Sequence, residues 1–127
     1  VFMHGPTFMA NPLACAVAAK STELRISQDW QSNIQRIETQ LRTALTPLQS
    51  LEYVHEVRVL GAIGVVELTF NVDMKTLQQE FVRRGIWVRP FGKLVYVMPP
   101  YVISTQELKT LLEQLVEVVV QMQEPVV

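Results

Sequence analysis

The chain has 127 residues and a net charge of −1; hydrophobic residues make up 49% of it and charged residues 18%. This length predicts one domain with a modest core, and the near-neutral charge gives no indication of a nucleic-acid or acidic-lipid partner. No apolar run approaches the ~20 residues that cross a membrane.

The high apolar fraction indicates faces that something outside this chain covers. The single cysteine, Cys15, excludes an internal disulfide and is typical of a reducing compartment. No signal peptide is recognisable, so we expect a cytoplasmic location.

The first predicted element is a helix that begins at Asn11-Pro12. Asn can cap the free N–H groups of the first turn, and Pro loses nothing at the next position, where an N–H would have no partner. Residues 13–19 are apolar nearly all the way round, which predicts burial on most sides of this helix. A second helix is predicted from about Ser27, because apolar residues recur at steps of three and four. These residues are Trp30, Ile34, Ile37, Leu41, Leu45 and Leu48.

Alternating apolar and polar residues predict strands from Val54 onward. One strand alternates around residues 57–59 and a second around residues 66–70. Gly61 and Gly64, between them, indicate a bend, a bulge or a close backbone approach.

The second half of the chain continues with helix and strand signals. A helix over about residues 73–84 should end at Gly85. Two strands, 86–89 and 94–98, are predicted on either side of a turn. Ser104 and Glu107 then form a capping-box pattern before a last amphipathic helix. Together these elements predict an α+β fold, with a small, mainly antiparallel sheet and helices packed on one face.

Arg89 is a candidate anion-binding residue. In the predicted strand, Ile86 and Val88 point to one side, and Trp87 and Arg89 to the other. Because residues 94–98 are apolar on both faces, we expect the second face to be covered too, and a covered Arg requires an anionic partner. Its planar guanidinium fits a carboxylate or a phosphate through two parallel bonds. The alternative is a structural salt bridge to a carboxylate of this or a neighbouring domain.

Thr7 is a second candidate. Its hydroxyl and the nearby N–H groups precede the capped helix, whose N-terminus carries a partial positive charge that favours a phosphate. The alternative is that Thr7 makes only a local turn or cap.

The other reactive side chains form no active-site pattern. His4 and His55 have no acidic or Cys companion at metal spacing, so no metal site is predicted. Cys15, in the small apolar helix, is interpreted as packing. The lysines lie outside the apolar settings expected of a Schiff-base lysine. They are Lys20, Lys75, Lys93 and Lys109.

Three stretches resemble the class III aminotransferases, which use pyridoxal 5'-phosphate. They are HGPTFMANPLACAVAA at 4–19, VRVLGAIGVVEL at 57–68 and WVRPFGKLVYVMPPY at 87–101. The resemblance covers essentially the whole chain and implies the C-terminal small domain of the fold type I transferases. The first stretch is shared across the family, whereas the last favours the biotin-pathway branch over the ornithine and 4-aminobutyrate aminotransferases.

The resemblance also implies site residues and substrates. Pro6 and Thr7 would hold the phosphate of the pyridoxal phosphate bound by the partner subunit of a homodimer. Gly5 would line the substrate pocket, and Arg89 would bind the carboxylate of the keto-acid substrate. In the biotin-pathway branch, the amino group of S-adenosylmethionine passes to 8-amino-7-oxononanoate and gives 7,8-diaminononanoate. The family often has Gly where this chain has Ala10; if that position requires a positive φ, Ala costs about 1 kcal/mol.

In the family the Schiff-base lysine lies upstream of the first stretch. We therefore expect no catalytic residue in this chain, and no activity of the chain alone. Residues 1–25 are expected to be a junction segment, the remnant of a large domain, with the phosphate-site loop and a buried helix. Residues 26–127 would be the C-terminal small domain. Two alternatives stay open: a non-catalytic isolated domain, or part of an aminotransferase of the ornithine or 4-aminobutyrate type.

Overall fold

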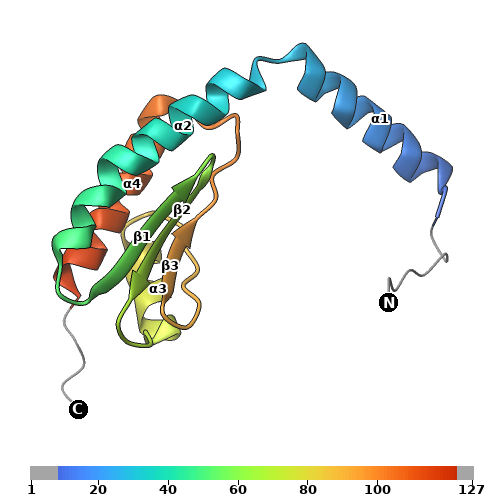
Figure 1. Cartoon of the computed structure of the whole chain (residues 1–127). Coiled ribbons are helices and arrows are strands. Elements are labelled where there is room, and N and C mark those ends of the chain that lie inside the picture. The colour runs from blue at the N-terminus through green and yellow to red at the C-terminus, as the bar shows by residue number, and fades with distance from the viewer. Residues whose placement is uncertain (1–8, 123–127) are drawn as a thin grey trace, which may run out of the picture. The chain divides into compact units, whose positions relative to one another are not determined.

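The computed structural model describes residues 9–122. The chain divides into two compact units, with the boundary between Gln31 and Ser32. The elements are α1 (Pro12–Ser27), α2 (Trp30–Leu45), the 3-10 helix η1 (Thr46–Ser50), β1 (Val54–Leu60), β2 (Ile63–Leu68), α3 (Met74–Arg83), β3 (Leu94–Val97) and α4 (Thr105–Gln121). The α-helices and strands are labelled in Figure 1.

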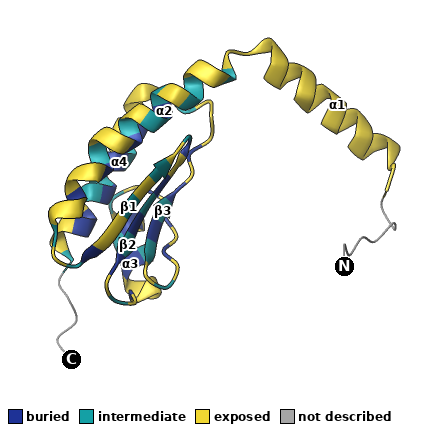
Figure 2. Ribbon diagram, viewed as in Figure 1, coloured by how far each residue is buried: buried dark blue, intermediate teal, exposed yellow. Residues whose placement is uncertain are grey.

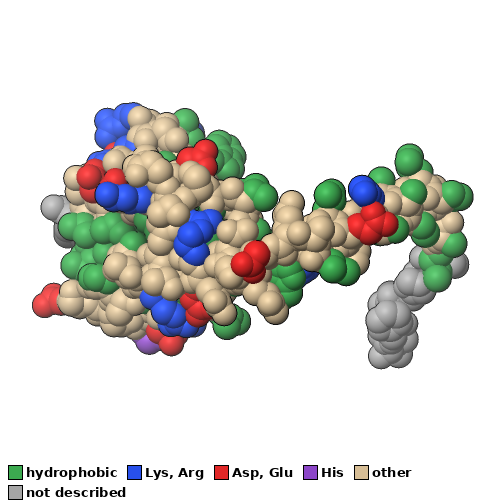
Figure 3. Space-filling model, turned by 90° about the horizontal axis from the view of Figure 1, so that it is seen from above, with side chains coloured by type: hydrophobic (Ala, Val, Ile, Leu, Met, Phe, Trp, Pro, Cys, Tyr) green, Lys and Arg blue, Asp and Glu red, His purple; other side chains and the backbone are tan. Residues whose placement is uncertain are grey.

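Helix α1 begins as predicted. The side-chain Oδ1 of Asn11 accepts a hydrogen bond of 3.0 Å from the N–H of Ala14. Every residue of α1 is exposed (Figure 2), including the hydrophobic Leu13 and Val17. Figure 3 shows hydrophobic side chains on the surface near the N-terminal end of the described chain. The expected burial of this helix and of Cys15 depends on cover from outside its unit, so it stays a prediction. Apolar residues surround the helix, but no other described element of its own unit covers them.

The second unit is built on the predicted apolar stripes of its helices. The stripe of α2 is buried from Ile37 onward, and η1 continues it with Leu48. Helix α3 is capped by Asp73 and is followed by Gly85, whose φ is +77°. These local signals were read correctly from the sequence.

Helix α4 begins with the predicted capping box. The N–H of Glu107 donates to Ser104 Oγ at 3.1 Å, and the N–H of Ser104 donates to Glu107 Oε2 at 2.9 Å. Five residues of α4 are buried against the rest of the unit. They are Leu108, Leu112, Leu115, Val118 and Val119.

The three strands form an antiparallel sheet in the order β1-β2-β3. Val57 pairs with Val66, which pairs in turn with Val95, so the buried residues of the strands share one face. This face and the buried sides of α2, α3 and α4 enclose one hydrophobic core. The predicted α+β fold, with a small antiparallel sheet and helices packed on one face, is confirmed.

The predicted strand over 86–89 is wrong. Outside the named strands, the connection before β3 makes one isolated bridge, between Phe91 and Leu94. Pro90 precedes this bridge; it has no N–H and restricts the backbone of the residue before it. Burial nevertheless alternates along this segment as it would along a strand.

The second face of the sheet carries exposed and half-buried side chains. The expected cover over this face is not supplied by residues 32–122. Its residues are Glu56, Arg58, Leu60, Ile63, Val65, Glu67, Leu94 and Tyr96.

Candidate functional site

Arg89 lies in the connection from α3 to β3, and this connection is held at both ends. At its start, the N–H of Ile86 donates to the carbonyl of Phe81 at 3.0 Å. At its end, Phe91 and Leu94 exchange two backbone hydrogen bonds of 2.8 Å. The backbone that carries Arg89 is therefore fixed to α3 and to β3.

The turn after Arg89 depends on glycine. Gly92 has a φ of +58° and is the first central residue of a two-residue turn, a position that favours Gly in type II′ turns. The carbonyl of Gly92 accepts from the N–H of Val72 at 3.0 Å, and the carbonyl of Lys93 accepts from the N–H of Leu68 at 2.9 Å. The sequence predicted the turn but not these bonds, because their partners are far away along the chain.

Side chains alternate between the core and the exterior along this connection. Ile86 and Val88 are 9% and 2% exposed, whereas Trp87 and Phe91 are 72% and 70% exposed. Arg89 is exposed as well, so its side chain points away from the core, as the alternation predicts. Among residues 9–122, no carboxylate forms an ion pair with Arg89. The alternative interpretation, in which Arg89 makes a structural salt bridge, therefore finds no carboxylate partner in that part of the chain.

Gly5, Pro6 and Thr7 lie outside the described residues, so their predicted roles stay predictions. The described residues that follow form the start of α1. The first turn of α1 has no acidic residue, so nothing there opposes the partial positive charge of the helix N-terminus. Ala10, just before the cap, has a φ of +54°. It occupies the left-handed region that favours glycine.

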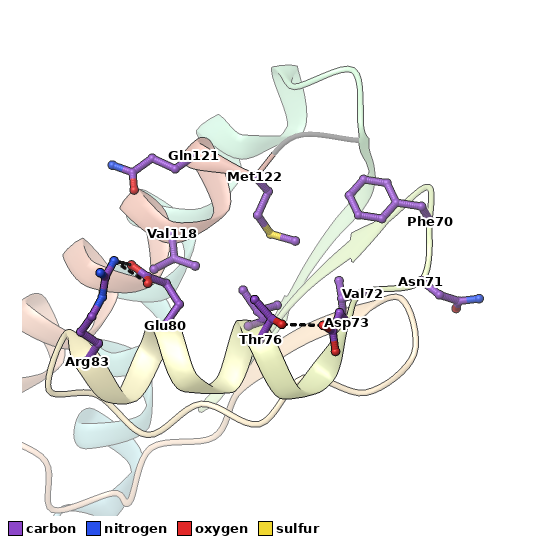
Figure 4. Close-up of a pocket in the computed structure, with 11 residues that line it drawn as sticks. Phe70, Asn71, Val72, Asp73, Thr76, Glu80, Arg83, Val118, Gln121 and Met122 are labelled. Atoms are coloured by element: carbon purple, nitrogen blue, oxygen red, sulfur yellow. Dashed lines mark hydrogen bonds and ion pairs between the residues drawn. The ribbon is translucent and has the colours of Figure 1, made fainter. Parts of the chain in front are cut away.

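A pocket between α3 and the end of α4 contains another group of charged side chains (Figure 4). The hydroxyl of Thr76 donates to Asp73 and lowers the pKa of this carboxyl. Hydrogen bonds from Arg83 and Arg84 lower the pKa of Glu80. The charged side chains of this pocket therefore have partners already, which is typical of structural ion pairs.

The remaining candidates within residues 9–122 form no second site. The four lysines are all exposed, and so is the thiol of Cys15. Within residues 9–122 there is no cluster of three or more His, Cys, Asp or Glu residues that could hold a metal ion. No described helix has both the length and the apolar character to cross a membrane.

Comparison with known sequences gives one consistent result. The family model for aminotransferase class III matches residues 1–119. The chain is 52% identical over 105 residues to the adenosylmethionine-8-amino-7-oxononanoate aminotransferase of Corynebacterium glutamicum, covering 83% of this chain and 25% of that protein. A protein of the same name from Mycobacterium leprae is 47% identical over 116 residues, covering 91% of this chain and 27% of the relative. The chain thus spans about a quarter of the length of these curated relatives.

Solved structures of transaminases share the fold. An (S)-enantioselective omega-transaminase from Thermomicrobium roseum has a TM-score of 0.82 and 29% identity, covering 94% of this chain and 29% of that one. The adenosylmethionine-8-amino-7-oxononanoate aminotransferase of Methanocaldococcus jannaschii has a TM-score of 0.77 and 26% identity, covering 95% and 30% of the two chains.

Proposed function

Because the chain belongs to the class III aminotransferase family, we propose that it forms the C-terminal part of an enzyme that transfers the amino group of S-adenosylmethionine to 8-amino-7-oxononanoate. The product would be 7,8-diaminononanoate, in biotin biosynthesis. Relatives at 47–52% identity carry the name of this activity, which favours it over the ornithine and 4-aminobutyrate types.

The observation that carries the proposal is Arg89, which is exposed on a backbone fixed at both ends. Its guanidinium would bind the carboxylate of 8-amino-7-oxononanoate through two parallel hydrogen bonds. Binding at the carboxylate would orient the ketone, at the other end of the same carbon chain, for the transfer. Arg89 is thus a substrate-positioning residue, and a fixed backbone keeps the cost of orienting the substrate low.

Pyridoxal 5'-phosphate is the cofactor we propose for the whole enzyme. The chemistry it supplies when bound is an electron-accepting ring that carries an amino group between two substrates. Pro6 and Thr7 would hold its phosphate in the site of the partner subunit of a homodimer, and Gly5 would line the substrate pocket. The first turn of α1 has no acidic side chain, which supports an anion near the start of this helix.

The parts of the chain would divide this work. Residues 1–25 would be a junction with a large domain, and residues 26–127 the small domain that presents Arg89. The lysine that bonds to the cofactor would belong to the enzyme upstream of residue 1. This chain would then bind and orient substrate without a covalent step of its own, in a cytoplasmic enzyme.

The proposal is tested with the full-length enzyme that contains this chain. With S-adenosylmethionine as donor, we expect 8-amino-7-oxononanoate to be converted to 7,8-diaminononanoate, detected by mass spectrometry. Ornithine and 4-aminobutyrate, each with a 2-oxo acid acceptor, serve as comparison donors. Faster turnover of either would contradict the proposal and favour the corresponding alternative.

A further inference from the structure

A side-chain hydrogen bond joins the turn after Arg89 to the segment that leads from β2 into α3. The ammonium of Lys93 donates to the carbonyl of Thr69 at 3.0 Å. We propose that Lys93 is a positioning residue, which fixes the turn after Arg89 and thereby the place where the guanidinium meets the substrate. This role rests on the proposed function, in which Arg89 binds the carboxylate of the keto acid.

The bond from Lys93 lies between two backbone bonds that hold the same turn. The N–H of Leu68, at the end of β2, donates to the carbonyl of Lys93 at 2.9 Å, and the N–H of Val72 donates to the carbonyl of Gly92 at 3.0 Å. Thr69 stands between these two donors along the chain. The ammonium therefore completes a set of three bonds between the turn and the segment before α3, and it is the one that a side-chain substitution can remove.

The segment that receives this bond is itself anchored at both ends. At its start, the N–H of Thr69 donates to the carbonyl of Tyr53 at 2.9 Å. At its end, Asp73 caps α3 by accepting a hydrogen bond of 3.1 Å from the N–H of Lys75 (Figure 4 shows Asp73 at the start of this helix). The carbonyl of Thr69 thus belongs to a fixed part of the backbone, and a bond to it restrains the turn.

An ion pair is the alternative role for an exposed lysine, and the structure does not favour it here. Within residues 9–122, no carboxylate forms an ion pair with Lys93. Glu67 is close enough for the charge of Lys93 to contribute to its lowered pKa, but the hydrogen bond from Arg58, at 2.6 Å, is the largest cause. Because Lys93 is exposed, its replacement should leave the core packing intact.

Loss of this bond should be felt at the carboxylate end of the substrate. Lys93 and Arg89 lie on one short connection, so a looser turn widens the range of positions that the guanidinium can take. A bidentate pair with a carboxylate requires both N–H groups to be aligned, and a misplacement of about 1 Å can cost a large part of a positioning effect. A substrate without the negative charge gains less from this pair, so it should be less sensitive to the loss.

The test compares two acceptors in the full-length enzyme: 8-amino-7-oxononanoate and its primary amide, which keeps the ketone and the carbon chain but carries no negative charge. The ratio of their kcat/KM values is the acid preference. Lys93→Met should lower the acid preference about three- to tenfold, as expected for the loss of one hydrogen bond. Lys93→Arg keeps a charged donor and should restore most of it. Lys109→Met, which removes an exposed lysine of α4, is the control and should leave it unchanged.

The double variant separates positioning from a direct effect of the lysine charge. If Lys93 acts through Arg89, adding Lys93→Met to Arg89→Ala should lower the acid preference no further. A further fall in the double variant would overturn the positioning role. An unchanged acid preference in Lys93→Met, even with a lower thermal midpoint, would also overturn it and leave the proposed function intact. An unchanged acid preference in Arg89→Ala would instead refute the proposed function itself.

Discussion

Gly64 of β2 lies directly beneath Leu45 of α2, so close that a Cβ at Gly64 would stand 2.7 Å from the Cδ1 of Leu45 and 3.1 Å from the Cδ2 of Leu41. Both leucines are buried, at 1% and 0% exposed, so neither side chain has free space into which to move. The absence of a side chain at Gly64 is therefore what allows α2 to pack closely on the sheet.

The first prediction concerns this contact. We expect Gly64→Ala to lower the free energy of unfolding of the chain by about 1–3 kcal/mol, because the added methyl overpacks a filled core. Urea unfolding followed by circular dichroism measures the change. Leu45→Val shortens the opposing side chain, so Gly64→Ala combined with Leu45→Val should lose less than the sum of the single changes. Strictly additive losses would show that the two residues do not compete for space.

The second prediction concerns the strained residue before α1. Ala10 has a φ of +54°, where a Cβ is unfavourable and glycine is not. Ala10→Gly should therefore stabilise the full-length enzyme by up to about 1 kcal/mol, seen as a rise in its thermal midpoint. Ala18→Gly, in the middle of α1, is the control and should destabilise the enzyme by about 0.5–1 kcal/mol. A lower midpoint for Ala10→Gly would argue against the left-handed conformation.

The third prediction concerns pH and the capping box of α4. Hydrogen bonds with Ser104 hold the pKa of the Glu107 carboxyl below its ordinary value of 4.5. A carboxyl whose pKa is lowered in the folded state stabilises the fold above the unfolded pKa, and this contribution is lost as the pH falls through the folded pKa. Acidification from neutral pH to below that pKa should therefore lower the thermal midpoint of the wild type.

Glu107→Gln provides the comparison. A Gln side chain can accept the same hydrogen bond from the N–H of Ser104 but does not titrate. Its thermal midpoint should lie below that of the wild type at neutral pH, and the difference should shrink in acid. A constant difference across this pH range would exclude the capping box as a source of acid sensitivity.

The sequence predicted those parts of the fold that depend on residues close together in the chain. The Asn11 cap, the Ser104–Glu107 capping box and the helix end at Gly85 are all local, and all were found. The prediction of a strand at 86–89 was wrong because strand pairing depends on where β3 lies in space. Local alternation of apolar and polar residues does not determine that position. The burial of α1 stays a prediction, since an apolar helix does not indicate which chain segment covers it.

In the candidate site too, local features were predicted from the sequence and long-range contacts were not. The alternation of apolar and polar residues predicted that Arg89 points away from the core. The structure confirms this direction, although residues 86–89 do not form a strand. The hydrogen bonds that fix its segment join residues distant in sequence, such as Val72 and Gly92, and no spacing indicates them. The roles of Gly5, Pro6 and Thr7 came from family resemblance, because a Thr before a helix is in itself most often a local cap.

The central claim is that the guanidinium of Arg89 binds the carboxylate of 8-amino-7-oxononanoate, and kinetics of the full-length enzyme test it most directly. Arg83→Ala is the matched control, because Arg83 is also an exposed arginine and its ion pair is with Glu80. In Arg89→Ala we expect kcat/KM for the keto acid to fall by the equivalent of roughly 2–4 kcal/mol, with a smaller effect on cofactor retention. Arg83→Ala should behave like the wild type. Unchanged keto-acid kinetics in Arg89→Ala would contradict the account.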